Sequence, residues 1–90
     1  MDRDFVIDLS KYIETRFFGE RPHIRGRRIP IAVIAHTASA NKHGVAELIY
    51  DFDLSEAEIL AALLYYSEHK VMIEAQEEAI HQEYKHFYED

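Results

Sequence analysis

The sequence predicts a mainly α-helical domain in which short N-terminal β-strands precede a three-helix core and a long C-terminal helix. Three observations support this fold class. β-Branched and aromatic residues are concentrated before residue 19. A proline at position 30 then precedes a series of helix-sized segments separated by short turns. From Ser55 to Asp90 the sequence contains neither glycine nor proline, so a long helix is permitted there.

Residues 1–29 are predicted to form an N-terminal β segment with a basic arm. Phe5–Ile7 and Tyr12–Phe18 are rich in β-branched and aromatic residues and are typical of strands. Ile24 and Ile29 flank a glycine, which suits a tight turn, and we expect a second short hairpin there. So few strands leave an unpaired sheet edge that another subunit could cover.

Residues 30–68 are predicted to form the helical core. The first helix is placed at Pro30–Ser39, because its apolar residues follow the i, i+3, i+4, i+7 rule. The second is placed at Val45–Tyr50. The third begins at Ser55, which forms a capping-box pattern with Glu58. Three helices of this size and spacing predict a helix-turn-helix, homeodomain-like core.

Residues 69–90 are predicted to be a C-terminal helical extension that binds a partner. One alternative is a continuous helix to about Tyr88, and the other is a break near Glu68–Lys70. Apolar residues recur every seven positions, at Ile59, Tyr66, Ile73, Ile80 and Phe87. Such a narrow stripe favours contact with another helix or a groove. The competing interpretation is packing against the chain's own domain.

Composition indicates one small domain. Ninety residues, 48% of them hydrophobic, are near the lower limit for a self-sufficient core, so we expect a homodimer. The absence of cysteine excludes a disulfide framework and a thiolate nucleophile, and fits a reducing cytoplasm. The charged N-terminus is unlike a signal peptide, and no apolar run has the length of a membrane span. We therefore expect a cytoplasmic location.

Charge is distributed unevenly along the chain. Residues 1–50 carry 8 basic and 6 acidic side chains, whereas residues 51–90 carry 2 basic and 11 acidic ones. The candidate nucleic-acid-binding residues are the five arginines of the basic segment, Arg16, Arg21, Arg25, Arg27 and Arg28. In the alternative interpretation, the last three of these pair with Asp51, Asp53 or an acidic helix of another subunit.

Nothing in the sequence favours an enzyme. There is no recognisable set of nucleophile, base and orienting residue, and no glycine-rich phosphate loop, so we expect neither catalysis nor a cofactor. The pairs Glu78/His81 and Glu83/His86 have the Glu-x-x-His spacing of di-iron bundles. Their five-residue offset rotates one pair by about 140° from the other on a helix, so no metal site is expected.

DNA binding by the usual helix-turn-helix mode is not expected either. In that mode the later helix enters the major groove and its first residues read bases. Here that helix begins with acidic residues at Glu56 and Glu58 and has no basic residue until Lys70. If DNA is bound, we expect the arginines of the basic segment to contact it.

Three stretches together resemble the domain-of-unknown-function family 433, which is related to VapB-type antitoxins. They are Pro22–Ile31, Val45–Ser55 and Ala61–Tyr66. The chain is similar in order and spacing to the family's opening, Gly-x-Pro-x-Ile-x-Gly-Thr-Arg-Ile-Pro-Val, but Arg21 stands in place of a small residue before Pro22. Arg27 replaces the usual threonine, and Phe52-Asp53 replaces the Tyr-Pro of the family's acidic turn.

The resemblance implies a VapB-like antitoxin of a type II toxin-antitoxin system. Such a protein would neutralise a PIN-like ribonuclease toxin by direct binding and regulate its own operator DNA. The expected toxin contacts are the apolar residues Ile73, Ile80, Tyr84 and Phe87. The alternative function is a stand-alone dimeric DNA-binding transcriptional regulator, and a third is a self-association module.

Overall fold

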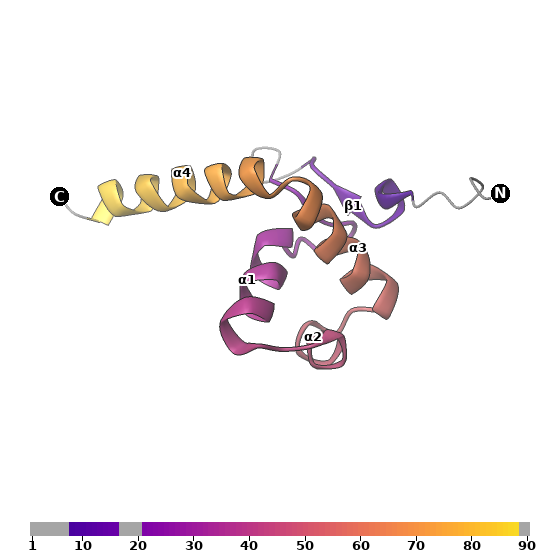
Figure 1. The fold of residues 1–90 in the computed structure, drawn as a ribbon. Helices are drawn as coiled ribbons and strands as arrows, with labels where there is room; N and C mark the ends of the chain where they lie inside the picture. The colour runs from indigo at the N-terminus through magenta and orange to yellow at the C-terminus, as the bar shows by residue number, and fades with distance from the viewer. Residues whose placement is uncertain (1–7, 17–20, 89–90) are drawn as a thin grey trace.

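The computed structural model describes residues 8–16 and 21–88 and shows a mainly helical fold with a short two-stranded sheet near its N-terminus (Figure 1). The mainly α class is therefore confirmed, as is the order of strands before helices. The elements are η1 (Leu9–Lys11, a 3-10 turn), β1 (Ile13–Glu14), β2 (His23–Ile24), α1 (Ile31–Asn41), α2 (Val45–Phe52), α3 (Glu56–Glu68) and α4 (Lys70–Tyr88).

Within the described residues, the sheet consists of two short strands. β1 and β2 pair antiparallel, with Ile13 opposite Ile24. The strand predicted at Phe5–Ile7 lies outside the described residues, as does the end of the one predicted at Tyr12–Phe18. The second predicted hairpin is a tight turn rather than a strand pair. In it the Ile24 N–H donates to the Ile29 carbonyl at 2.9 Å, and the intervening glycine has φ +80°.

The first two helices both extend beyond their predicted ends. α1 continues to Asn41 and α2 to Phe52, two residues later than predicted in each case. Each is followed by a residue in the left-handed conformation, Lys42 at φ +57° and Asp53 at φ +56°. These residues donate their N–H groups back to the last turn and end the helices without a glycine. The sequence carries no strong signal for such an ending.

The start of α3 is as predicted. The Ser55 hydroxyl accepts from the Glu58 N–H at 3.1 Å, and the Glu58 carboxylate accepts from the Ser55 N–H at 2.8 Å. This reciprocal capping box satisfies two backbone donors that the helix itself cannot pair. Leu54 and Ile59, on either side of the cap, are both buried in the core.

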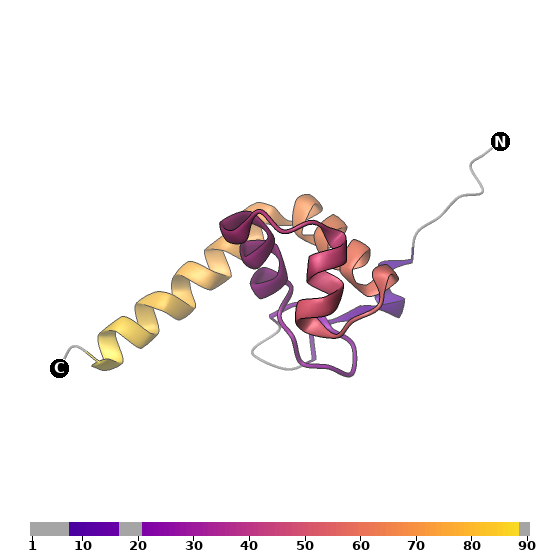
Figure 2. The ribbon, with the colours of Figure 1, turned by 90° about the horizontal axis from the view of Figure 1, so that it is seen from below.

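The core lies between α1, α2 and α3, with contributions from the sheet and from α4. Both α1 and α2 pack against α3 (Figures 1 and 2). The apolar face predicted for α1 is confirmed, because Ile31, Ile34 and Ala35 are buried and Ala38 is partly buried. The buried hydrophobic residues are Ile13, Ile24, Ile31, Ala32, Ile34, Ala35, Leu48, Leu54, Ile59, Ala61, Ala62 and Ile73.

Of the two alternatives for the last helix, the break is the one observed. His69 leaves the helical conformation at φ −126° and ψ 29°, and α4 then runs in a new direction (Figure 2). The His69 ring stacks on Tyr65 with 4.1 Å between ring centroids, and its Nδ1 donates to the Tyr65 carbonyl at 3.1 Å. The His69 N–H is shared between the Tyr65 and Tyr66 carbonyls, at 3.0 and 3.2 Å, a bifurcated bond of the kind common at helix ends.

The capping box gives a stability prediction. Ser55→Ala removes the acceptor for the Glu58 N–H and should lower the free energy of unfolding by about 1 kcal/mol, measured by chemical denaturation. The matched control is Ser39→Ala, which changes an exposed serine inside α1 and should leave stability unchanged or slightly higher. Equal losses in the two variants would contradict the prediction.

Candidate partner-binding surface

α4 is attached to the core along its first turns and then projects from it. Ile73, only 1% exposed, is part of the core cluster. The helix has 19 residues, which is about 28 Å of length. Its distal part extends away from the other three helices (Figure 1), and the molecule measures 57 × 25 × 23 Å. The attachment therefore fixes the direction in which the exposed end of α4 points.

A bidentate ion pair forms the first polar attachment. The Arg21 Nε and Nη2 atoms donate to the two Glu77 carboxylate oxygens, each at 2.7 Å. Both side chains are partly buried, with exposures of 22% and 17%. Two parallel charge-assisted hydrogen bonds at such sites are stronger than a typical surface ion pair. They connect the segment just before β2 to the second turn of α4.

A three-residue cluster forms the second polar attachment. The Glu74 Oε2 atom of α4 accepts from the Tyr66 hydroxyl at 2.5 Å and lies 2.7 Å from His36 Nε2. The two hydrogen bonds, from Tyr66 and then His36, lower the pKa of Glu74. The same carboxylate raises the pKa of Tyr66 to about 12, because a proton on the phenol is needed for the hydrogen bond. The cluster therefore connects α1, α3 and α4.

The four expected toxin contacts lie in different environments. Ile73 is buried in the chain's own core, so it cannot contact a partner in this fold, and that assignment is corrected. Ile80 is half-buried, and Tyr84 is 60% exposed on the projecting part of α4. Phe87 belongs to α4, but its side chain lies outside the described part. α4 also exposes Val71 and Met72, which the heptad pattern did not select.

Arg21, Arg25 and Arg27 of the basic segment each donate to oxygen atoms of other parts of the chain. Arg21 binds Glu77, as described above. Arg25 donates to the Ser10 carbonyl at 2.8 and 3.1 Å and to Glu14 at 3.2 Å. Arg27 donates to the Asp53 carbonyl at 2.9 Å, at the C-terminal end of α2. The alternative interpretation predicted that Arg27 pairs with the carboxylate of Asp51 or Asp53. Arg27 does bind Asp53, but through the backbone carbonyl and not through the carboxylate.

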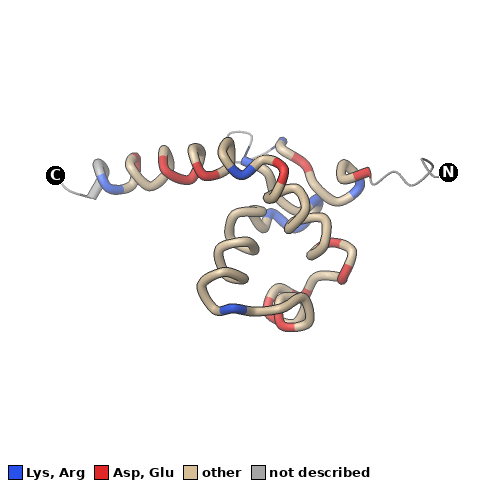
Figure 3. The backbone as a smooth tube through the Cα atoms, viewed as in Figure 1, with Lys and Arg blue, Asp and Glu red and all other residues tan. Residues whose placement is uncertain are grey.

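The remaining arginines of the basic segment, Arg16 and Arg28, are also exposed. The Arg16 side chain is 71% exposed, with 3.8 Å between its Nε and Glu14. Arg28 is exposed and has a left-handed backbone, with φ +56°. Acidic residues follow one another along α4 and occur near the ends of α2 and α3 (Figure 3). The projecting helix is therefore the acidic part of the molecule.

Glu14 is a central residue of the N-terminal sheet that the sequence pattern did not indicate. Its side chain is 8% exposed and accepts from the Gly26 N–H at 3.2 Å. This hydrogen bond lowers the pKa of Glu14, and the nearby arginines add to the effect. His23, which is fully buried, has its Nε2 atom 3.3 Å from the same carboxylate and donates from Nδ1 to the Arg21 carbonyl. The basic segment therefore has its own internal counter-ion.

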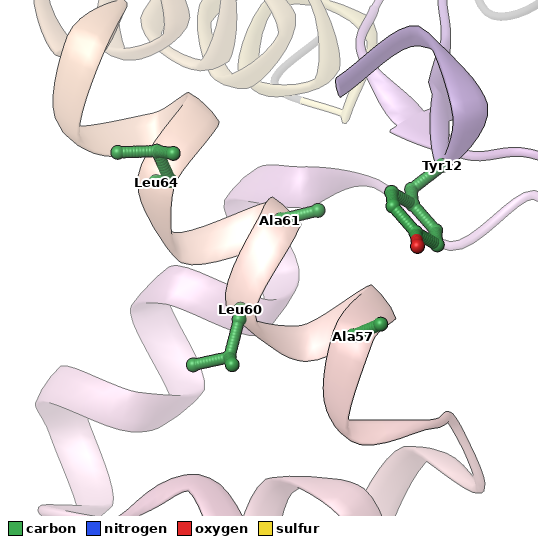
Figure 4. A pocket seen from close by; sticks show the side chains of 5 residues that line it. All are labelled: Tyr12, Ala57, Leu60, Ala61 and Leu64. Atoms are coloured by element: carbon green, nitrogen blue, oxygen red, sulfur yellow. The ribbon is translucent and has the colours of Figure 1, made fainter. Parts of the chain in front are cut away.

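The outward side of α3 is apolar. A hollow of about 220 Å³ lies there, lined by Tyr12, Ala57, Leu60, Ala61 and Leu64 (Figure 4). Leu60 is 49% exposed. Among residues 8–16 and 21–88, no group of three His, Asp or Glu side chains is arranged to hold a metal ion. No helix in this part of the chain is both long and apolar enough to cross a membrane.

The hydrogen bond between Tyr66 and Glu74 predicts a tyrosine with a raised pKa. Because the pKa of Tyr66 is raised from 10.0 to about 12, its stabilising contribution is present below pH 10 and is lost as the pH rises to 12. Glu74→Gln should return the pKa of Tyr66 towards 10.0, as followed by tyrosinate absorbance. Tyr66→Phe is the control and should abolish the part of the tyrosinate absorbance change that titrates near pH 12. If that part of the absorbance change remains in Tyr66→Phe, the assignment to Tyr66 is contradicted.

The Arg21–Glu77 pair predicts strong coupling between two residues distant in sequence. A double-mutant cycle with Arg21→Gln and Glu77→Gln should give a coupling free energy of about 1–2 kcal/mol in chemical denaturation. The matched control is Glu78→Gln, at the residue that follows Glu77. The Glu78 carboxylate accepts a hydrogen bond from Gln82 on the same helix. Coupling below about 0.3 kcal/mol would show that the pair does not hold α4.

Comparison with known proteins gives one match. Residues 13–66 match the family described as protein of unknown function (DUF433). Neither a curated protein nor a solved structure matches the chain. The matched region runs from β1 to the end of α3, and α4 lies outside it. Since it spans more than half of the sequence, this chain belongs to the DUF433 family.

Proposed function

We propose that this protein is an antitoxin that binds a PIN-like ribonuclease toxin through the projecting part of α4. The observation that carries the proposal is the division of α4 into an attached and a projecting part. Its first turns are held by Ile73, Glu74 and Glu77, whereas Tyr84 is 60% exposed beyond them. A helix held rigidly at one end is preorganised to present its other end to a partner.

The charge of α4 suits this partner. A ribonuclease must attract RNA phosphates, so the rim of its substrate site is expected to be basic. The projecting residues Glu78 and Glu83 are acidic and exposed, and can complement such a rim. Ile80 and Tyr84 supply apolar area between them, and blockade of the RNA path is the proposed mechanism.

Operator binding is a secondary part of the proposal. The helix-turn-helix, homeodomain-like description of the core is likewise retained as an interpretation. Arg16 and Arg28, both of which are exposed, are the proposed phosphate contacts. Two such contacts would give weak binding that falls with only a shallow slope as salt increases. For this reason we favour toxin neutralisation over a stand-alone DNA-binding regulator.

The test measures RNA cleavage by the PIN-like ribonuclease encoded beside this protein in its own genome. The full chain should inhibit cleavage at a one-to-one ratio, and Tyr84→Ala should weaken inhibition about tenfold or more. Tyr50→Ala is the matched control, because Tyr50 is 87% exposed but lies on α2. The absence of such a gene, or cleavage that the full chain leaves unchanged, would overturn the proposal.

A further inference from the structure

Polar contacts around His23 connect the N-terminal sheet to the attachment of α4. His23 lies in β2 opposite Glu14 of β1, and its side chain is fully buried. Its Nδ1 atom lies 2.8 Å from the Arg21 carbonyl oxygen, and its Nε2 atom lies 3.3 Å from the Glu14 carboxylate. The side chain of the same Arg21 binds Glu77 of α4. One buried ring therefore contacts both β1 and the residue that holds α4.

Both ring nitrogens of His23 face oxygen atoms that only accept hydrogen bonds. A carbonyl and an ionised carboxylate have no proton to donate. A neutral imidazole has a single N–H, so either tautomer would place a nitrogen lone pair against one of the two oxygens in a buried site. Only the imidazolium form has a donor on each nitrogen. The geometry therefore fits a ring that carries both protons.

The carboxylate that faces His23 is stabilised in its ionised form. The Gly26 N–H donates to Glu14 Oε2 at 3.2 Å, and this hydrogen bond lowers the pKa of Glu14. Arg25 donates to Glu14 Oε1 at 3.2 Å, and the Arg16 Nε atom lies 3.8 Å from the same oxygen. Among the residue types in this cluster, histidine is the one whose charge ordinarily changes between about pH 5 and pH 8.

We propose that His23 is a pH-sensitive switch that controls how firmly α4 is held. With a proton on each nitrogen, the ring binds Glu14 and the Arg21 carbonyl at the same time. Loss of one proton as the pH rises breaks one of these contacts, because the remaining N–H serves only one oxygen. The backbone at Arg21 is then less firmly fixed, and its guanidinium group loses the precise position that a bidentate bond to Glu77 requires.

His36 and His69, the histidines next to the first turns of α4, differ from His23. His36 Nε2 lies 2.7 Å from Glu74, and His69 Nδ1 donates to the Tyr65 carbonyl at 3.1 Å. In each of these bonds one ring nitrogen contacts the acceptor, so a neutral tautomer with its proton on that nitrogen keeps the bond. The side chains of the His36–Glu74 pair are also 48% and 40% exposed, where an ion pair adds little. The pH response is therefore assigned to His23.

The direction of the effect follows from the proton count. At acidic pH α4 keeps the observed orientation, and at alkaline pH its projecting end samples a wider range of directions. A partner that binds the observed orientation must then order the helix first, so it should bind more weakly as the pH rises. This consequence for toxin binding rests on the proposed function, whereas the switch itself does not.

Two measurements on the full chain test the proposal without any toxin. In the first, nuclear magnetic resonance follows the ring nitrogen chemical shifts of His23 in the wild-type protein. They should show a proton on both nitrogens at about pH 6 and on one nitrogen at about pH 8. A ring whose protonation does not change between these two pH values would overturn the proposal.

The second measurement is the distance between spin labels on Ser39→Cys in α1 and Gln82→Cys in α4. Both positions are exposed, and the natural chain has no cysteine. The fraction of molecules with a displaced α4 should rise about tenfold between about pH 6 and pH 8, the factor expected for the loss of one hydrogen bond to a charged group. A fraction that does not depend on pH would also overturn the proposal.

Two variants of the labelled chain assign the response to one histidine. His23→Gln is neutral at every pH and should give the larger displaced fraction at both pH values. His36→Gln is the matched control, because it changes a histidine that contacts α4 directly, and it should retain the pH response. The opposite pattern would contradict the assignment to His23. Circular dichroism checks that the variants are folded, and the two wild-type measurements decide the proposal if His23→Gln is not.

Discussion

The ion pair between Arg21 and Glu77, together with the burial of Ile73, is the constraint on which the arrangement of this molecule depends. These contacts connect the segment before β2 to a helix that begins almost fifty residues later. The apolar contact supplies most of the attraction, and the bidentate geometry restricts the rotation of α4 about it. Without both, α4 would be attached through the Glu74 cluster and its backbone at His69.

The same pair changes how the basic segment is interpreted. Arg21 is occupied by Glu77, Arg25 by a backbone carbonyl and Glu14, and Arg27 by the end of α2. These guanidinium groups satisfy carbonyl and carboxylate oxygens that short irregular segments leave unpaired. Arg21, Arg25 and Arg27 therefore stabilise the fold. The positive charge that they can offer to a phosphate group is smaller than the composition suggests.

Two separate surfaces result from this arrangement. The outward side of α3 is apolar around the hollow beside Tyr12. The projecting end of α4 is acidic and carries the proposed toxin contact.

The sequence by itself determined the fold class, the family and the local helix signals. The capping box at Ser55 and the apolar face of α1 were predictable, because each depends on residues a few positions apart. Two residues of the heptad pattern, Ile59 and Ile73, are buried, but the pattern could not show that Ile73 is used by the chain's own core. Periodicity gives the face of a helix and not the element that covers it.

Only the tertiary structure decided where the long helix bends and which charges are paired. The bend lies at His69, whose ring stacks on Tyr65 and whose N–H is shared between two carbonyls, and the sequence has no standard signal for it. The partners of Glu74, Glu77 and Glu14 come from other elements, so their identity follows from packing. Contacts between distant residues are set by the whole fold, whereas caps and periodicities are set by neighbours along the chain.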